Sequence, residues 1–228
     1  MKSYTLSPRL TVIADFAKDK KTIADIGCDH GKISVYLAEK GSYVHAVDIS
    51  KPSLQKARDL AKIEGVGNKI SFYCDDGLNS IKHIKLDAVI IAGMGWRMIS
   101  SILDKNQECI KSIDTLVLQP MDSVIDLRKY ICSNNYTIND EKLIWDDGRL
   151  YTVLVAQYKR NQGLSLLQQL LGPKILENKD VLINDLIEKE LRKRNQILLG
   201  LNKAKSKNRN QICQIKKEIE MLETEYKR

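Results

Sequence analysis

An acidic and glycine-rich run from Asp25 to Gly31, which reads DIGCDHG, is the first segment of the sequence whose residues and spacing suit a chemical role. Glycine is needed where the backbone turns tightly beneath a ligand, and a helix that starts directly after such a turn presents free N–H groups. Asp48 follows 21 residues after Gly27, at the end of the next apolar run. A carboxylate there can accept both ribose hydroxyls of a nucleoside cofactor. The two segments together predict a nucleoside-binding site.

The spacing of this run separates two classes of nucleotide-binding loop. A G-x-G-x-x-G pattern would indicate a nicotinamide cofactor, and the run does not contain it. Its D-x-G-x-D-x-G spacing resembles instead the D/E-x-G-x-G-x-G loop of methyltransferases, with Asp29 at the place of the middle glycine. The alternative interpretation is an ordinary strand-to-helix turn whose glycines serve packing alone.

Two further segments with possible chemistry follow the third and fourth apolar runs. Asp75 and Asp76 precede Gly77, where one of them could simply make a turn. The fourth run ends in IAGMGW, residues 91–96, without the N/D-P-P-Y/F pattern by which methyltransferases hold exocyclic amino groups. No cysteine stands at the fourth or sixth strand to attack C5 of a base. These features favour a ring nitrogen, which is already nucleophilic, as a methyl acceptor.

The elements that must position these residues follow from periodicity. Between Lys21 and Tyr158, short apolar runs rich in β-branched residues alternate with segments of helical period, which is typical of βαβ units and a parallel sheet. Ser50 is the expected cap of the second helix. Strands are predicted over 22–26, 44–49, 70–74, 87–92 and 115–119, and helices over 32–40, 51–64, 96–105 and 122–134.

The pattern changes after the fifth strand. Residues 136–145 alternate, Asp147 and Gly148 read as a turn, and residues 151–158 alternate again, which predicts a β-hairpin. Five parallel strands followed by a hairpin resemble a class I (Rossmann-like) methyltransferase, in which the seventh strand runs antiparallel between its neighbours. The resemblance implies an α/β fold with a seven-stranded sheet and S-adenosylmethionine as cofactor.

The chain beyond Arg160 has no strand pattern. A polar helix is predicted over 180–202, and apolar residues from Ile212 to Tyr226 recur at steps of 3 and 4, as in a coiled-coil seam. We expect an antiparallel coiled-coil hairpin around a basic loop at 203–210, with a dimerisation arm as the alternative. Two domains are therefore predicted, residues 1–160 and 161–228.

The net charge of +8 is distributed unevenly, since +7 of it lies after Tyr158. Such asymmetry favours a polyanionic partner for the C-terminal domain, whereas the alternative is a solvated helix surface.

Four motifs occur in the order found in one family. They are the Asp25–Gly31 run, IAGMG at 91–95, LVLQP at 116–120 and WDDGRLY at 145–151. With an N-terminal helix around Arg9, they resemble the bacterial tRNA adenine-N1 methyltransferase family that modifies position 22 of tRNA, the TrmK family. Trp96 and Met121 depart from it, because the family usually has glycine and asparagine there. Trp96 either stacks on a flipped base or narrows the pocket.

The resemblance implies a cofactor site and a tRNA substrate. The predicted cofactor-binding residues are Asp25, Gly27, Cys28, Gly31, Asp48, Ile49, Asp75, Asp76, Ala92 and Gly93. Residues expected near the target base are Arg9, His30, Met94, Gly95, Trp96, Gln119 and Pro120. Basic residues expected to follow tRNA phosphates are Lys193, Arg194, Lys203, Lys205, Lys207 and Arg209.

The implied reaction assigns Asp29 as the catalytic residue. N1 of neutral adenine carries a lone pair, so methyl transfer by in-line displacement needs mainly an unstacked, aligned base. The product is a cation, which a carboxylate near N6 would stabilise and whose proton it could accept. A side chain at the place of the middle glycine projects where the backbone passes closest to the cofactor. The alternative is that Asp29 caps the helix beginning near Lys32, and His30 is a weaker candidate for proton transfer.

Composition bounds the remaining possibilities. The five cysteines are an odd number without CxxC or Cys/His spacing, which indicates a reduced compartment and no metal site. No apolar run approaches the roughly 20 residues that span a bilayer, and the N-terminus lacks the h-region of a signal peptide. We therefore expect a cytoplasmic monomer without membrane contact.

Three other functions are alternatives to this interpretation. A methyltransferase of another RNA, a protein or a small molecule would share the cofactor half, and the basic C-terminal domain argues against the last two. A noncatalytic RNA-binding or scaffolding protein could retain the same pocket. A dehydrogenase is disfavoured by the glycine spacing and by the terminal hairpin.

Overall fold

The computed structural model describes residues 3–203 and 208–227. It divides into two compact units, Met1–Gln162 and Gly163–Arg228, whereas the sequence pattern places the domain boundary at residue 160.

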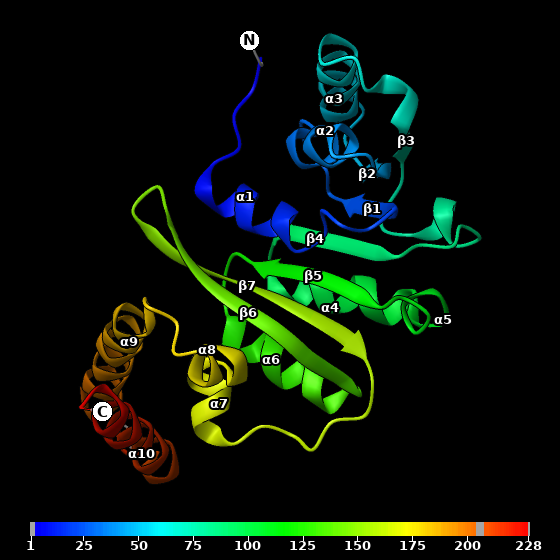
Figure 1. Cartoon of the computed structure of the whole chain (residues 1–228). Coiled ribbons are helices and arrows are strands. Elements are labelled where there is room, and N and C mark those ends of the chain that lie inside the picture. The colour runs from blue at the N-terminus through cyan, green and yellow to red at the C-terminus, as the bar shows by residue number, and fades with distance from the viewer. Residues whose placement is uncertain (1–2, 204–207, 228) are drawn as a thin grey trace. The chain divides into compact units, whose positions relative to one another are not determined.

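The first unit is built on one seven-stranded sheet (Figure 1). The strand order is β3-β2-β1-β4-β5-β7-β6, and β7 pairs antiparallel with both β5 and β6. The order reverses between β1 and β4, which creates a crevice at the carboxyl ends of these strands. The predicted class I fold, with its antiparallel seventh strand, is confirmed. The strands are β1 (Thr22–Ile26), β2 (Tyr43–Asp48), β3 (Ile70–Cys74), β4 (Ala88–Met94), β5 (Thr115–Pro120), β6 (Tyr136–Asp146) and β7 (Arg149–Tyr158).

The burial of the strands explains why apolar runs in the sequence predict them. Ile23, Ile90 and Val117, on the three central parallel strands, are fully buried. Parallel strands covered on both faces read as continuous apolar runs, while β6 shows the alternation of a half-buried strand. The five parallel strands lie within two residues of their predicted bounds.

Helices cover both faces of the sheet (Figure 1). α1, α2 and α3 pack side by side on one face, and α4 and α6 on the other. Ser50 caps α3 by accepting the Ser53 N–H at 3.2 Å, as predicted. The helices are α1 (Pro8–Asp15), α2 (Lys32–Glu39), α3 (Lys51–Ile63), α4 (Trp96–Lys105), α5 (Gln107–Ile110) and α6 (Val124–Ser133), with 3₁₀ turns at Gly67–Lys69 and Asn79–Ile81.

The turn between β6 and β7 has the predicted form. Asp147 and Gly148 both have positive φ, 47° and 67°. Two such residues make the tight turn whose twist matches that of antiparallel strands. The hairpin signal in the sequence is confirmed.

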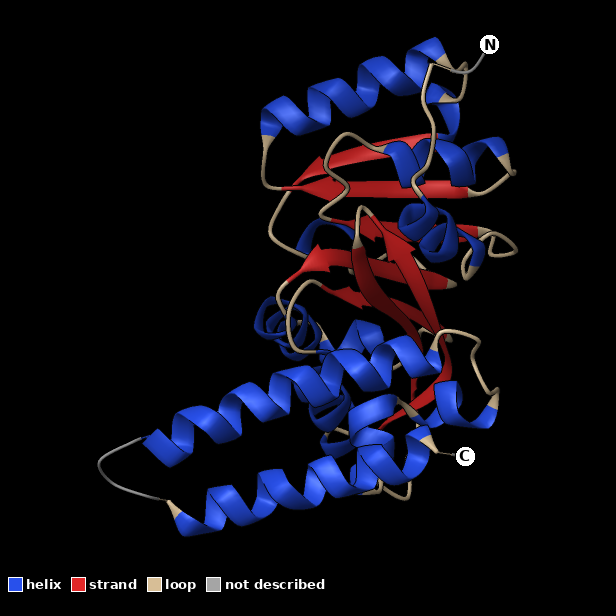
Figure 2. Ribbon diagram, turned by 90° about the vertical axis from the view of Figure 1, so that its left-hand side faces the viewer, coloured by secondary structure: helices blue, strands red, loops and turns tan. Residues whose placement is uncertain are grey.

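The second unit contains only helices among its described residues. They are α7 (Leu166–Leu171), α8 (Pro173–Glu177), α9 (Ile183–Lys203) and α10 (Arg209–Tyr226). α9 and α10 lie antiparallel within one chain (Figure 2), and the Tyr226 hydroxyl donates to Glu188 across the pair at 3.0 Å. The intramolecular hairpin is therefore confirmed, with Leu222 of the predicted seam buried and Tyr226 half exposed.

The α9–α10 interface differs from the prediction in one respect. The sequence pattern suggests an apolar stripe on α9, but Glu190 and Arg194 are buried there beside Leu186 and Ile187. Arg194 pairs with Glu190 in its own helix and donates to Glu218 of α10 at 2.8 Å. A charged side chain is tolerated at this depth because both carboxylates neutralise it.

Candidate active site

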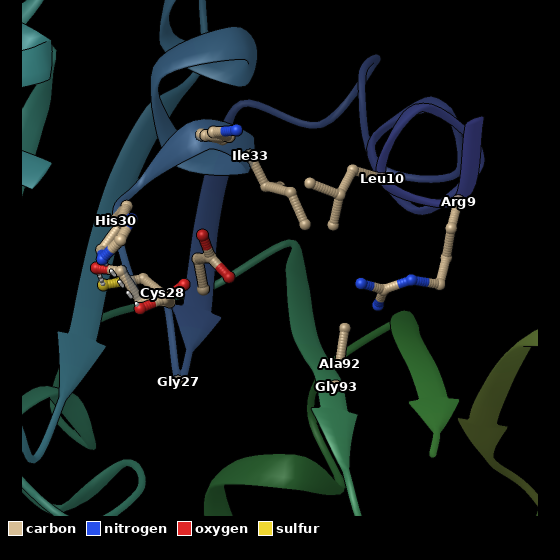
Figure 3. Close-up of a pocket in the computed structure, with 11 residues that line it drawn as sticks. Arg9, Leu10, Gly27, Cys28, His30, Ile33, Ala92 and Gly93 are labelled. Atoms are coloured by element: carbon tan, nitrogen blue, oxygen red, sulfur yellow. Dashed lines mark hydrogen bonds and ion pairs between the residues drawn. The ribbon is translucent and has the colours of Figure 1, made fainter. Parts of the chain in front are cut away.

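Two adjoining cavities lie at the carboxyl ends of the parallel strands. The first cavity, of about 330 Å³, and the second cavity, of about 370 Å³, share Gly27, Ala92 and Gly93. The first cavity is also lined by Ile26, Asp48, Ile49, Asp75, Asp76, Gly77, Met94, Met98 and Ile102. The second cavity is also lined by Arg9, Leu10, Asp25, Cys28, Asp29, His30, Lys32 and Ile33 (Figure 3).

Gly27 carries the chain between the two cavities. Its φ is +71°, and a Cβ at this position would clash with the methyl group of Met94. The N–H groups of Gly27 and Cys28 both donate to the Val47 carbonyl, at 2.8 and 3.0 Å. The loop is thereby held against β2, which leaves the space above it open. A side chain at position 27 would remove this space.

Asp48 joins the loop after β1 to the start of α3. Its Oδ2 accepts the Asp29 N–H at 2.9 Å, and its Oδ1 accepts the Ser50 N–H at 2.8 Å. A carboxylate oxygen has two lone pairs, so each can still accept a hydroxyl from a ligand. The two hydrogen bonds therefore fix the Asp48 carboxylate on the wall of the first cavity.

Asp75 and Asp76 have different surroundings in the first cavity. Asp75 accepts the Ser80 backbone N–H at 2.6 Å and its hydroxyl, and hydrogen bonding by Ser80 lowers the pKa of Asp75. Asp76 forms an exposed ion pair with Lys105 at 3.4 Å. Asp75 shapes the turn, and Asp76 remains the more open acceptor.

Asp25 is the buried acid of the second cavity. It is 3 % exposed and accepts the Ser34 hydroxyl at 2.6 Å. Burial raises the pKa of Asp25 to about 6, the charge of Asp48 raises it further, and the Ser34 hydrogen bond opposes the shift. Burial also raises the pKa of the Cys28 thiol, which makes that residue a neutral wall and not a nucleophile.

Arg9 enters the second cavity from α1. Its Nη1 donates to Gln119 Oε1 at 2.7 Å, and its guanidinium lies 5.2 Å from the centre of the Tyr151 ring. Arg9 Nε is buried and lies 3.6 Å from Asp146 Oδ2, and it has no hydrogen-bond partner among the residues that the structure describes. Figure 3 shows the guanidinium extending from α1 toward Ala92. The second cavity therefore has Asp25 as its buried acid and Arg9 as a partly buried cation, a pairing that suits a zwitterion.

Asp29 and His30 form the rim of the second cavity. Asp29 has φ 50° and a side chain that is 73 % exposed. Its carboxylate is 3.5 Å from Ser53 Oγ and 3.6 Å from His30 Nε2, and Lys56 Nζ lies 3.3 Å from the same nitrogen. The N-cap of α2 is Gly31, and no side chain caps that helix. The alternative role of Asp29 as the cap of α2 is therefore wrong.

The residues expected near a target base are not all at a cavity. Met94 lines the first cavity, whereas Gly95, Trp96, Gln119 and Pro120 line neither of the two. Gly31, which is predicted to bind the cofactor, also lines neither cavity. Gln119 is fully buried and Pro120 is buried as well, so neither presents a surface to a large substrate. The predicted direct contact by Gln119 is replaced in the structure by hydrogen bonds to Arg9 and to the Gly93 N–H.

Sequence reasoning missed Asp122, which lies beside these residues. Asp122 Oδ1 accepts the Trp96 N–H at 2.7 Å. Asp122 directly follows Met121, but no periodic signal pairs it with a residue 26 positions earlier. Met98 and Ile102, which also line the first cavity, follow each other at helical spacing on α4 and read as ordinary core positions.

The predicted phosphate contacts in the second unit fall into three groups. Lys193, Lys203 and Arg209 are exposed. Arg194 is 5 % exposed and bound by two glutamates, so it does not belong to the basic surface. Lys205 and Lys207 lie outside the described residues.

A methyltransferase-domain family model matches residues 6–154, more than half of the chain. The chain belongs to the methyltransferase-domain family. The tRNA (adenine(22)-N(1))-methyltransferase of Bacillus subtilis is 29% identical over 231 residues, which cover 97% of each chain. The predicted resemblance to the TrmK family is confirmed.

Two solved structures of this family resemble the whole chain. The B. subtilis m1A22 tRNA methyltransferase TrmK has 28% identity and a TM-score of 0.82, and the match covers 97% of this chain and 99% of that one. The TrmK of M. capricolum, in complex with S-adenosyl-homocysteine, has 27% identity and a TM-score of 0.82, with coverage of 98% and 99%. The similarity therefore includes the helical second unit.

Two features are absent from the part of the chain that the structure describes. No group of three or more His, Cys, Asp or Glu side chains in residues 3–203 and 208–227 could hold a metal ion. Within the same ranges, no helix is long and apolar enough to cross a membrane.

Proposed function

We propose that this chain transfers the methyl group of S-adenosylmethionine to N1 of an adenine in tRNA, at position 22. The observation that carries the proposal is the pair of adjoining cavities: the first offers hydrogen-bond acceptors for the adenosine half of that cofactor, and the second offers an acid and a cation for its amino-acid half. The target base and position follow the B. subtilis relative, which aligns over 97% of each chain.

The first cavity suits the adenosine half. Asp48 offers free lone pairs to the ribose hydroxyls, and Asp76 offers an acceptor to the adenine amino group. Ile49 is 73% exposed and Met98 is 53% exposed on the same cavity, and they provide apolar surface for the faces of the base. When bound, the cofactor supplies an electrophilic methyl group on a sulfonium.

The second cavity suits the amino-acid half. Asp25 pairs with the ammonium group, and Arg9 pairs with the carboxylate. This assignment moves Arg9 from the target base, where the family resemblance places it, to the cofactor.

The catalytic work that remains for the protein is positioning and charge stabilisation. Asp29 is exposed at the rim, where its carboxylate can face the cation that forms on the base and accept its proton. His30, within 3.6 Å of Asp29, is the group through which that proton could leave.

The second unit is proposed to bind tRNA phosphates. Lys193, Lys203 and Arg209 are exposed on α9 and α10, so they can contribute affinity that is sensitive to salt and largely independent of sequence. Because tRNA is the proposed substrate and the α9–α10 hairpin closes within one chain, we propose a cytoplasmic enzyme that acts as a monomer.

The decisive experiment incubates the purified protein with unmodified tRNA and labelled S-adenosylmethionine, followed by nucleoside analysis. We expect N1-methyladenosine in the wild-type tRNA and none when adenine 22 is replaced by guanine. The Asp29→Ala variant is expected to bind the cofactor and lose the product. Cofactor binding without methyl transfer to any tRNA would contradict the proposal and favour a noncatalytic RNA-binding protein.

A further inference from the structure

The segment from Gly93 to Trp96, here called the β4 exit, leaves the sheet beside both cavities. Gly93 lines both cavities and Met94 lines the first. Trp96 then begins α4. The β4 exit therefore runs along the junction at which the proposed methyl donor and its acceptor must meet, and its position affects their alignment.

The end of β5 holds the β4 exit through three successive hydrogen bonds. Gln119 Oε1 accepts the Gly93 N–H at 3.2 Å. The Met121 N–H donates to the Met94 carbonyl at 2.9 Å. Asp122 Oδ1 accepts the Trp96 N–H at 2.7 Å. Two of the three bonds use side chains, so they depend on residue identity.

The first bond secures an irregular point in the strand. The pairing of β4 with β5 shifts register between Ala92 and Met94, and Gly93 has φ +74°. A bulge of this kind removes a ladder hydrogen bond and redirects the strand. Gln119 replaces the lost partner, and because it is fully buried and also bonded to Arg9 and to the Pro120 carbonyl, it has little freedom to move.

The third bond secures the start of α4. Gly95 is the N-cap of this helix, and it has no side chain to cap it. Asp122 supplies the cap from a different loop, where its charge also favours the positive end of the helix. The absence of a side chain at Gly95 permits this approach, since a Cβ there would lie 3.1 Å from Asp122 Oδ2. The Arg97 guanidinium, 5.1 Å from the centre of the Trp96 ring, packs on the exposed side of the same turn.

We propose that Gln119 and Asp122 are positioning residues for methyl transfer, which act by holding the β4 exit in register with the two cavities. The inference rests on the proposed methyltransferase function. Neither side chain lines either of the two cavities, so each acts through Gly93 or Trp96. Misplacement of reacting groups by about 1 Å can cost roughly 100-fold in rate, which makes such residues visible in kcat.

The kinetic test compares Asp122→Ala with Asp122→Asn. Alanine removes the cap, so we expect kcat for tRNA methylation to fall about 30-fold, while the dissociation constant of S-adenosylmethionine stays within about twofold. Asparagine keeps an acceptor oxygen and should restore most of the rate. The matched control is Asp114→Ala. Asp114 is also exposed, but it directly precedes β5, whereas Asp122 lies beyond the other end of that strand, so this variant should retain the wild-type rate.

Gln119 is tested in the same way. Gln119→Glu keeps an acceptor for the Gly93 and Arg9 N–H groups, whereas Gln119→Leu keeps none. We expect the leucine variant to lose rate and also to weaken cofactor binding, because Arg9 loses its partner. Equal rates in the wild-type and leucine proteins would overturn the role of Gln119.

A second readout is independent of activity. The sequence contains two tryptophans, so Trp145→Phe leaves Trp96 as the reporter at the start of α4. In that background, Asp122→Ala should lower the fluorescence anisotropy of Trp96, and Asp122→Asn should not. Unchanged anisotropy would overturn the inference, whether or not the rate falls, because Asp122 would then not be positioning Trp96. If the wild-type protein methylates no tRNA, the proposed function fails, and the anisotropy still tests the positioning.

Discussion

The two cavities stabilise their acids in opposite ways. Asp48 in the first cavity accepts hydrogen bonds from two backbone N–H groups, so its carboxylate is held in place before any ligand binds. Asp25 in the second cavity is buried with one hydroxyl partner, and burial raises its pKa to about 6. The first cavity is preorganised for neutral hydroxyl and amino groups, while the second gains most from a ligand that brings a positive charge.

The largest expected effect comes from replacing Asp25, the buried acid of the second cavity. Because the pKa of Asp25 is higher in the folded protein than its usual 3.8, folding favours the protonated acid, and stability declines as pH rises from about 4 through 6. Asp25→Asn should therefore raise the free energy of unfolding by up to about 3 kcal/mol at pH 8. Thermal unfolding at pH 4 and pH 8 checks this, and a variant less stable than wild type at pH 8 would contradict it.

The next effect concerns the first cavity. Asp48→Ala should weaken binding of S-adenosylmethionine about 100-fold, because hydrogen bonds to a charged acceptor contribute about 1.5–3 kcal/mol each. Isothermal titration calorimetry measures the loss. Asp59→Ala, an exposed aspartate on α3, is the control. Wild-type affinity in Asp48→Ala would remove this residue from the cofactor site.

A smaller effect distinguishes Asp25 from Asp48 by the pH dependence of cofactor affinity. Protonation of Asp25 removes its attraction for the cofactor ammonium, so wild-type affinity should fall about tenfold between pH 7.5 and pH 5. In Asp25→Asn the affinity should be lower at pH 7.5 and nearly constant over this range. A wild-type affinity that does not vary with pH would show that Asp25 does not contact the charged group.

The smallest effect tests whether the stability that the Ser50 cap gives to α3 is separate from the cofactor affinity that Asp48 provides. Ser50→Ala removes the cap of α3 and should cost about 1 kcal/mol of stability. Cofactor affinity should stay within about twofold, because the Ser50 N–H that donates to Asp48 remains. Chemical denaturation and calorimetry on one preparation give both values. A large loss of affinity with little loss of stability would contradict the separation.

The extent of successful prediction differs between local and long-range features. The Asp25–Gly31 run predicted a tight turn between β1 and α2, and the structure has it, with Gly27 and Gly31 at positive φ. Arg194 shows the limit. Its sequence neighbours Lys193 and Arg192 are exposed. Only the packing of α9 against α10 shows that Arg194 is buried and donates a hydrogen bond to Glu218, 24 residues away.

The sequence by itself determined the strands, the longer helices, the acidic and glycine-rich loop and the terminal hairpin, because these depend on residues that are close neighbours in the chain. It did not predict the short helices α5, α7 and α8. Only the tertiary structure decided that Gln119 joins Arg9, 110 residues away, to Gly93, 26 residues away, and that Asp122 caps the helix of Trp96. Such contacts follow from the strand order, which places β4 beside β5 and α1 against both β5 and the hairpin. The local periodicity of the sequence does not determine that strand order.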